Sequence, residues 1–240
     1  MPARQLGKIC TAVAATTCEE MVKKAQVAFS LGSEIVEFRV DKLEERTSAA
    51  EAKKRLGRFA TKSIVTVRSK EEGGGFMGTE EERLKLISGL AAELSPAYFD
   101  VELATVKANL GWFRRLTSAA SRPDRMIISW HDFSGTPDFQ TLSSLRKEAM
   151  KRGDIAKIVT MAKSPDDNLT LLMLYQEDAK DLVAFCMGQE GTASRILSLQ
   201  LGSPVVYASL PGEPVAPGQL SVVTVKAIKK MLLAKAARKS

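Results

Sequence analysis

Eight short apolar runs recur along the 240-residue chain, and segments with helical periodicity separate them. The runs are rich in β-branched residues, as strands are, whereas segments such as 18–32 and 79–94 repeat apolar residues every three or four positions. Alternating strands and helices predict a parallel sheet. Eight such units in a chain of this length fit a closed (β/α)₈ barrel better than an open doubly wound sheet, and no glycine-rich dinucleotide or phosphate-binding motif follows the first run. The predicted strands lie at residues 8–15, 34–40, 63–68, 98–103, 125–131, 155–161, 181–187 and 204–209.

Length and composition favour a single globular unit. No linker or low-complexity segment divides the chain, so we expect one barrel domain over residues 1–240. The N-terminal segment lacks the apolar core of a signal peptide, and no apolar run approaches the roughly 20 residues that a membrane span needs. Cys10, Cys18 and Cys186 lie in or beside predicted regular structure, without the spacing or the neighbouring histidines of a zinc site. We therefore expect reduced packing cysteines, no metal and a cytoplasmic protein.

The net charge of +7 raises the question of a nucleic-acid partner. Positive residues are spread along the chain, with one concentration at the C-terminus, where Ile228, Met231, Leu232 and Leu233 are expected to form the docked face of a basic last helix. Aromatic residues make up 6% of the chain and no nucleic-acid-binding motif occurs, so no base-stacking face is predicted. We expect binding to neither nucleic acid nor membrane.

Active sites of such barrels lie at the carboxyl ends of the strands, so polar residues in and after the strands are candidates. Lys157 lies in an otherwise apolar run and shares a strand face with Ile155 and Val159. Because barrel strands are covered on both faces, this side chain is expected to point into the barrel. Burial can lower the pKa of a lysine by several units, which makes a neutral amine available to form an imine with a carbonyl group. The alternative is a lysine paired with a carboxylate inside the barrel; Lys163, in the following loop, is a weaker candidate because it is expected to be solvated and protonated.

His131 is the only histidine of the chain and ends the predicted strand beside that of Lys157. Neighbouring parallel strands lie about 5 Å apart, so the two side chains can meet in the mouth of the barrel. A histidine pKa near 6–7 suits proton transfer at neutral pH. Trp130 is expected on the opposite face, packed between barrel and helices. A lone histidine is more often an ordinary surface or core residue, but its place beside Lys157 favours catalysis.

Charged residues also mark the second, third and fourth predicted strands. Glu37 and Arg39 point the same way and can form an ion pair in the mouth, either as a structural salt bridge or to bind hydroxyl groups. Arg68 ends the third strand and precedes Glu71, Glu72 and three glycines, which predict a mobile loop or a plain flexible connection. Further acidic residues on these inward faces are Asp41, Asp100 and Glu102.

Two later segments offer groups for an anionic substrate. Gly188 and Gly191 form a predicted turn before a helix that carries Arg195 in its first turn, an arrangement suited to a carboxylate or a phosphate. A long proline- and glycine-rich loop follows the last strand and ends in Gly218 and Gln219. Each signal is weak by itself.

Together these residues resemble the type I 3-dehydroquinate dehydratases along nearly the whole chain. Seven short motifs occur in the family's order with plausible spacings, which argues against chance similarity. They are EFRVD (37–41), TVRSKEEGG (66–74), DVEL (100–103), SWHDF (129–133), KIVTMAK (157–163), MGQEGTASR (187–195) and APGQ (216–219).

The resemblance implies a (β/α)₈ hydro-lyase, usually dimeric, that converts 3-dehydroquinate to 3-dehydroshikimate and water in the shikimate pathway without a cofactor. It implies that Lys157 forms an imine with the substrate ketone and that this imine is the electron sink. His131 would remove the C2 proton, return a proton to the departing C1 hydroxyl and help make and break the imine, with Glu72 rather than Glu71 supporting the imidazole. The implied substrate contacts are Glu37, Arg39 and Arg68 at the ring hydroxyls, Arg195 and Gln219 at the carboxylate, and Met187 against the ring.

One position departs from the family pattern. Val215 stands where a serine is often found, so a substrate contact made by that serine is lost here or comes from another group, such as Ser209. The runner-up function is a class I aldolase or transaldolase, which also uses a barrel lysine imine but breaks a carbon–carbon bond. Product formation separates the two, because dehydration of 3-dehydroquinate gives an enone that absorbs in the near ultraviolet.

Overall fold

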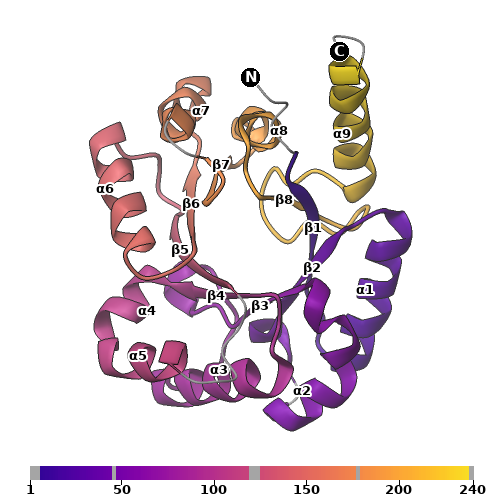
Figure 1. Cartoon of the computed structure of the whole chain (residues 1–240), viewed down its shortest axis with the longest axis vertical. Helices are drawn as coiled ribbons and strands as arrows, with labels where there is room; N and C mark the ends of the chain where they lie inside the picture. The colour runs from indigo at the N-terminus through magenta and orange to yellow at the C-terminus, as the bar shows by residue number, and fades with distance from the viewer. Residues whose placement is uncertain (1–5, 45–46, 119–124, 177–178, 238–240) are drawn as a thin grey trace.

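The computed structural model describes residues 6–44, 47–118, 125–176 and 179–237, and these confirm the predicted (β/α)₈ barrel (Figure 1). One eight-stranded sheet has the strand order β7-β6-β5-β4-β3-β2-β1-β8, and its strand pairings are parallel. The ring stays open between β7 and β8, where the described residues form no strand pairing. The strands are β1 (Lys8–Val13), β2 (Ile35–Arg39), β3 (Ser63–Thr66), β4 (Tyr98–Glu102), β5 (Arg125–Asp132), β6 (Ile155–Met161), β7 (Leu182–Met187) and β8 (Val205–Ala208).

Helices follow the strands along the chain and surround the barrel (Figure 1). Local sequence sets several of their ends: Thr17 accepts a hydrogen bond from Glu20 N, Thr79 forms a capping box with Glu82, and Gly32 ends the first helix at a left-handed φ of 114°. Among the described residues, no helix combines the length and the apolar character that crossing a membrane requires. The helices are α1 (Cys18–Leu31), α2 (Ala49–Leu56), α3 (Glu80–Leu94), α4 (Leu103–Ala108), α5 (Leu110–Ser118), α6 (Phe139–Met150), α7 (Pro165–Leu172), α8 (Thr192–Leu201) and α9 (Val222–Ala237), with short 3₁₀ helices η1 (Val40–Lys42), η2 (Gly57–Lys62), η3 (Lys70–Glu72) and η4 (Met173–Gln176).

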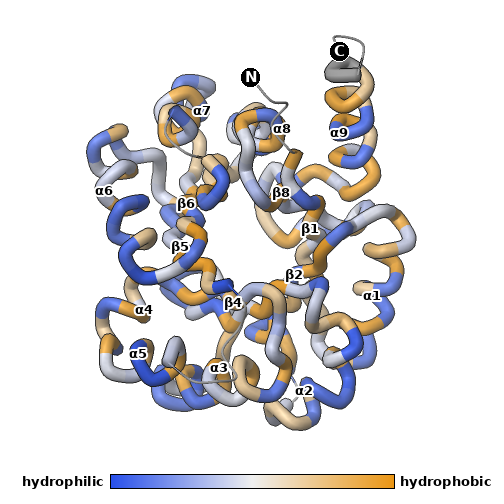
Figure 2. Tube along the Cα trace, viewed as in Figure 1, coloured by the Kyte–Doolittle hydropathy of each residue, from blue (hydrophilic) through white to orange (hydrophobic). Residues whose placement is uncertain are grey.

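Alternation along the strands separates an outer core from an inner one. Outward residues such as Phe38 and Ile158 pack against the helices, and Trp130 lies on this side as predicted. Figure 2 shows that hydrophobic and hydrophilic segments alternate along the helices, as expected for helices with one face on the barrel and one toward solvent. Inward residues near the amino ends of the strands fill the bottom of the barrel, which we call the apolar floor. It consists of Cys10, Ile35, Ile64, Ile127, Ile155, Val183 and Val205, each at most 2% exposed.

The three cysteines are free and buried, in agreement with their predicted role as packing residues. The last helix, α9, differs in part from its predicted orientation. Ile228 and Leu232, one helical turn apart, pack against a cluster that includes Ile9. Met231 and Leu233 are instead 57% and 51% exposed, because they fall on either side of the stripe that Ile228 and Leu232 define. The predicted four-residue docked face is therefore wrong for these two positions.

Candidate active site

One cavity opens at the carboxyl ends of the strands, where barrel enzymes carry their sites. It brings together the predicted residues Glu37, Arg39, Arg68, Glu72, His131, Lys157, Met187, Arg195 and Gln219. Other lining residues include Phe133, Phe185, Tyr207 and Val215. In the part of the chain that the structure describes, no cluster of histidine, cysteine and acidic side chains is suited to holding a metal ion.

Lys157 points into the barrel from the middle of β6, with 4% of its surface exposed. Its Nζ donates to Asp100 Oδ2 at 2.9 Å and to Glu37 Oε1 at 3.4 Å. Nζ also lies 4.3 Å from the ring centroid of Tyr207, in cation–π contact. The predicted inward direction is confirmed, and so is the alternative of a lysine paired with carboxylates inside the barrel. Lys163 is exposed, as expected for the weaker candidate.

Glu37, Asp100, Lys157 and Tyr207 form one layer across the barrel, which we call the ionic layer. They come from β2, β4, β6 and β8, and alternate strands supply the side chains of one layer in (β/α)₈ barrels. Two positions earlier, β2, β6 and β8 carry Ile35, Ile155 and Val205, three of the residues of the apolar floor. The ionic layer therefore rests on apolar packing, and charges in such low-dielectric surroundings interact strongly.

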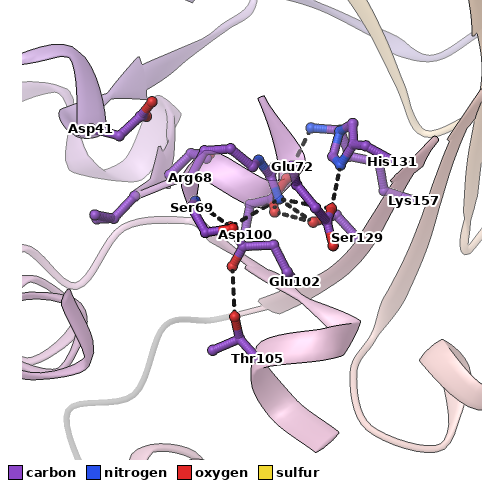
Figure 3. Close-up of polar contacts among 12 residues, drawn as sticks. Asp41, Arg68, Ser69, Glu72, Asp100, Glu102, Thr105, Ser129, His131 and Lys157 are labelled. Carbon is purple, nitrogen blue, oxygen red and sulfur yellow. Dashed lines mark hydrogen bonds and ion pairs between the residues drawn. The ribbon is translucent and has the colours of Figure 1, made fainter. Parts of the chain in front are cut away.

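Arg68 joins the ionic layer to the mouth of the cavity (Figure 3). Its Nη2 donates to Asp100 Oδ1 at 2.8 Å, and its Nη1 donates to Ser129 Oγ at 2.6 Å. The Ser129 hydroxyl donates in turn to Asp100 Oδ1 at 2.6 Å. Burial opposes ionisation of Asp100, but Arg68 and Lys157 together hold its pKa below the usual range. Asp100 therefore stays a carboxylate and acts as an anchor for both cations.

His131 lies one inward-facing position nearer the mouth than Lys157, because the β5–β6 register places Lys157 opposite Ser129. The two side chains were predicted to meet in the mouth of the barrel, and both line this cavity. Nδ1 of His131 lies 2.8 Å from Glu72 Oε2 (Figure 3). Glu72, from η3, is thus the partner of the imidazole, whereas Glu71 is exposed.

Burial favours the uncharged forms of both members of this pair. Together with Arg68 and Lys157, it lowers the pKa of His131 well below the ordinary value. Burial also raises the pKa of Glu72 to about 8, against the opposing effect of Arg68. The expected histidine pKa near 6–7 is therefore wrong, and the group of this pair that titrates near neutrality is Glu72. Once ionised, Glu72 accepts a hydrogen bond from Nδ1–H of His131, and Nε2 is then the unprotonated nitrogen that can take a proton.

The predicted ion pair between Glu37 and Arg39 is wrong. Arg39 instead donates from Nε and Nη2 to the two carboxylate oxygens of Asp41, at 2.9 Å and 2.8 Å. This happens because the strand gives way to η1 directly after Arg39, so the alternation of a strand no longer sets the direction of Asp41. Asp41 also accepts the N–H of Gly75 at 3.0 Å and so fastens the glycine-rich loop. Glu37 accepts from Thr66 Oγ1 at 2.9 Å in addition to its contact in the ionic layer.

Close packing accounts for the first two glycines of that loop. Gly73 has a φ of 77°, and a Cβ there would lie 2.4 Å from Cζ of Phe133. A Cβ at Gly74 would lie 2.0 Å from the carbonyl oxygen of Arg68. The ring of Phe133 stacks in turn on His131, with centroids 6.5 Å apart and an interplanar angle of 21°. Gly73 thus leaves room for Phe133 to stack on the imidazole, a reason that the sequence alone does not reveal.

Arg195 is a buried cation that has no carboxylate partner among the described residues. It is 3% exposed, donates from Nη2 to the carbonyl of Pro217 at 3.1 Å, and lies 4.4 Å above the ring of Phe185. Its Nε has no hydrogen-bond partner in the described part of the chain. Burial lowers its pKa to about 10. Arg195 could therefore donate hydrogen bonds to an anion in the cavity, as predicted for a carboxylate site.

Gln219 organises the loop after β8. Its Oε1 accepts from the backbone of Val215 at 3.0 Å, and its Nε2 donates to the carbonyl of Ala208 at 3.0 Å. Val215 lines the cavity at the position discussed above. Ser209 is not among the lining residues, and its hydroxyl donates to the carbonyl of Leu220 at 3.5 Å. Ser209 is therefore not placed to supply the substrate contact suggested for it.

A second charged cluster supports the turn that carries Glu72. Glu102 accepts from the backbone of Ser69 at 2.8 Å and from Arg83 Nη1 at 2.9 Å (Figure 3 includes Ser69 and Glu102). Arg83, from α3 and 2% exposed, also donates to the carbonyl of Val67 at 2.7 Å. These bonds fix the chain between β3 and η3. The sequence indicates Glu102 as an inward acid, but gives no signal for Arg83, because a lysine- and glutamate-rich helix face ordinarily predicts solvent exposure.

Asp100, Ser129 and Tyr207 contact the predicted site but are not among its predicted residues. The sequence could have indicated Asp100 and Ser129, because both are polar residues in a strand. Ser129 shares its inward strand face with His131, and Asp100 shares its face with Glu102. Tyr207 carries a weaker signal, since an aromatic residue in an apolar run usually indicates packing.

Comparisons with known proteins agree with this geometry. The family model of type I 3-dehydroquinases matches residues 9–235. The 3-dehydroquinate dehydratase of Pyrococcus abyssi is 37% identical over 226 residues, which cover 93% of this chain and 98% of the relative. That of Methanocaldococcus jannaschii is 35% identical over 226 residues with the same two shares. The crystal structure of 3-dehydroquinate dehydratase from Geobacillus kaustophilus superposes with a TM-score of 0.80 at 28% identity and covers 95% of this chain and 91% of that one. The aldolase and transaldolase alternative is thereby set aside, and the chain belongs to the type I 3-dehydroquinase family of hydro-lyases.

Proposed function

We propose that this chain converts 3-dehydroquinate to 3-dehydroshikimate and water through an imine on Lys157. One observation carries the proposal: a buried amine, an imidazole–carboxyl pair and a guanidinium without a carboxylate partner among the described residues line the same cavity. An amine can form a covalent bond to a ketone, an imidazole can move protons, and a guanidinium can bind a carboxylate. The names of the relatives supply the substrate.

The first step joins Lys157 to the ketone carbon of the substrate. Overall, an ammonium group and a ketone give an iminium ion and one water, so the positive charge stays on Nζ and no net proton is taken up. Asp100 and Glu37 hold the amine from the side of the ionic layer. The iminium ion then accepts electrons when the neighbouring carbon loses its proton.

The second step is the proton transfer at His131. Nε2 takes the C2 proton, the C–H electrons form an enamine, and ionised Glu72 stabilises the resulting imidazolium through Nδ1. The imidazolium then protonates the C1 hydroxyl, which leaves as water while the enamine electrons form the new double bond. Hydrolysis of the remaining iminium ion consumes one water and frees Lys157, so the balance is two waters released and one consumed.

The binding roles follow from the cavity lining. We assign the substrate carboxylate to Arg195, the ring hydroxyls to Glu37, Arg39 and Arg68, and apolar contact with the ring to Met187. Gln219 acts by holding the Val215 loop against the cavity, since both polar atoms of its amide bind backbone groups.

We also propose that the chain works in the cytoplasm as a homodimer of single-domain subunits spanning residues 1–240, in the shikimate pathway, with no cofactor and no nucleic-acid or membrane partner. The resemblance to the family supports the dimer, and the sequence features above support the rest. Sedimentation of the purified chain tests the dimer directly; a monomer at all concentrations would contradict it.

Trapping the imine tests the mechanism. The chain is incubated with 3-dehydroquinate, product formation is followed by near-ultraviolet absorbance, and borohydride is added before peptide mass mapping. We expect the reduced adduct on the peptide that carries Lys157, with none in Lys157→Gln. Lys163→Gln is the matched control, because Lys163 lies in the following loop and is exposed, and it should label and turn over as the unaltered chain does. A label on Lys163, or product without any label, contradicts the proposed mechanism.

A further inference from the structure

Buried polar side-chain atoms without a protein partner are candidates for contact with a bound ligand or water. Across the described residues, three buried side-chain atoms have no hydrogen-bond partner: Arg152 Nε, Arg195 Nε and the hydroxyl of Tyr207. Two of these residues, Arg195 and Tyr207, line the active-site cavity. Leaving such a group unsatisfied costs stability, so a native chain normally keeps one only where a ligand or water completes it. Arg195 already has an assigned ligand group, the carboxylate, whereas Tyr207 has none.

Tyr207 occupies the position next to the reacting nitrogen. Its side chain extends inward from β8 with 5% of the residue exposed, and its ring lies against Phe185 with centroids 5.9 Å apart. Nζ of Lys157 lies 4.3 Å from the centroid of the Tyr207 ring. The carbon that Nζ bonds is one covalent bond further on. Oxygens on that carbon or on the next one are therefore expected beside the Tyr207 ring, which carries the hydroxyl without a partner among the described residues.

Chemistry fixes the direction of the hydrogen bond. Burial and the carboxylate of Glu37 raise the pKa of Tyr207 well above the ordinary value, so the hydroxyl keeps its proton at neutral pH and can donate it. The substrate offers acceptors at this end, since the carbon that joins Lys157 carries the ketone oxygen until the imine forms and ring hydroxyls lie on nearby carbons.

We propose that Tyr207 is a substrate-binding residue whose hydroxyl donates a hydrogen bond to a substrate oxygen on the imine-forming carbon or on its neighbour. The inference rests on the proposed function and adds a contact that neither the sequence motifs nor the ion pairs indicate. It also gives the ionic layer two separate tasks: the carboxylates hold Nζ, and the tyrosine holds the molecule that Nζ attacks.

The test compares the same substitution at two buried tyrosines. Tyr207→Phe removes a hydroxyl that has no hydrogen-bond partner among the described residues but keeps the ring that faces Nζ. Tyr175→Phe is the matched control, because the Tyr175 hydroxyl donates to the carbonyl of Ala184 at 3.0 Å and accepts from its N–H at 2.7 Å, on the outer side of β7. We expect opposite results: Tyr207→Phe keeps the melting temperature and lowers kcat/KM roughly 3- to 10-fold, whereas Tyr175→Phe lowers the melting temperature and keeps kcat/KM.

Tyr207→Phe should still give the borohydride adduct at Lys157, because its ring and the carboxylates remain. An unchanged kcat/KM in Tyr207→Phe overturns the inference and leaves water as the partner of the hydroxyl. A fall in its melting temperature overturns it too, because the hydroxyl would then be paired within the protein. The proposed function fails on different evidence, namely no product and no adduct with the unaltered chain.

Discussion

Replacing Lys157 by methionine removes the cation that two buried carboxylates share. Nζ lies 2.9 Å from Asp100 Oδ2 and 3.4 Å from Glu37 Oε1, and neither carboxylate side chain is more than 5% exposed. After the substitution Asp100 keeps Arg68 at 2.8 Å, and Glu37 keeps the hydrogen bond from Thr66 at 2.9 Å. The charge of Glu37 is therefore the one left without its ion-pair partner.

Removing one partner of a buried ion pair costs about 3–5 kcal/mol. Because Asp100 retains Arg68, we expect the lower end, about 3 kcal/mol in the free energy of unfolding. In a chain of this size each kcal/mol shifts the melting temperature by about 2–4 °C, so Lys157→Met should melt roughly 6–12 °C lower. The loss should stay nearly constant down to the ordinary aspartate pKa of about 4 and shrink as the pH falls below it. A depressed aspartate pKa adds stability above its unfolded value and loses it in acid, and Lys157 is one of the two cations that depress the pKa of Asp100.

Thermal unfolding followed by circular dichroism measures this loss, and a second substitution identifies its cause. Glu37→Gln in the Lys157→Met background removes the unpaired charge and should restore at least half of the lost stability, with activity absent in both variants. In the unaltered background the same Glu37→Gln change removes a paired charge and should not stabilise. A Lys157→Met chain that melts within 1–2 °C of the unaltered one, or a double variant no more stable than Lys157→Met, would refute the reasoning.

Three further predictions concern the mouth of the cavity. Since the pKa of Glu72 is about 8, raising the pH from 7 to 9 ionises Glu72, leaves Nε2 of His131 unprotonated and should raise kcat/KM about tenfold. Glu72→Gln should be slower and should show no such rise between pH 7 and 9. A pH profile in Glu72→Gln that matches that of the unaltered chain would count against this role of the Glu72–His131 pair. Arg195→Met should raise KM roughly 10- to 150-fold with a smaller change in kcat, as steady-state kinetics would show, because a charged hydrogen bond to the substrate is lost. Gly73→Ala should lower activity because its Cβ would lie 2.4 Å from Phe133, and Phe133→Ala in the same chain should recover part of the loss if this clash is the cause.

The fold and most of the site follow from periodicity in the sequence. Strands and helices alternate eight times, which fits a parallel barrel better than an open sheet, and inward alternation places Lys157 and His131 at the end where such barrels carry their sites. The prediction fails where alternation stops. The chain enters η1 directly after Arg39, and Arg39 then pairs with Asp41 rather than with the residue two positions before it.

Periodicity also does not encode the burial and the nearby charges that surround a side chain in the fold. The pKa of His131 depends on how completely the loops bury it and on two nearby cations, which come from distant parts of the chain. The roles of Tyr207 and Arg83 are hidden for a related reason. An aromatic residue in an apolar run and an arginine on a charged helix look ordinary until tertiary contacts show what each one faces.

The apolar floor closes the barrel at the amino ends of its strands. Seven isoleucine, valine and cysteine side chains, none more than 2% exposed, close it beneath the ionic layer. On the proposed mechanism, the oxygen of the substrate ketone leaves as water beside Lys157, and we expect the covalently bound substrate to lie between this water and the solvent. The same water is then well placed to hydrolyse the iminium ion later in the cycle. A substrate whose ketone carries heavy oxygen should therefore give a product ketone that retains part of the label. The heavy-oxygen content of the product would thus report on the closed end of the barrel.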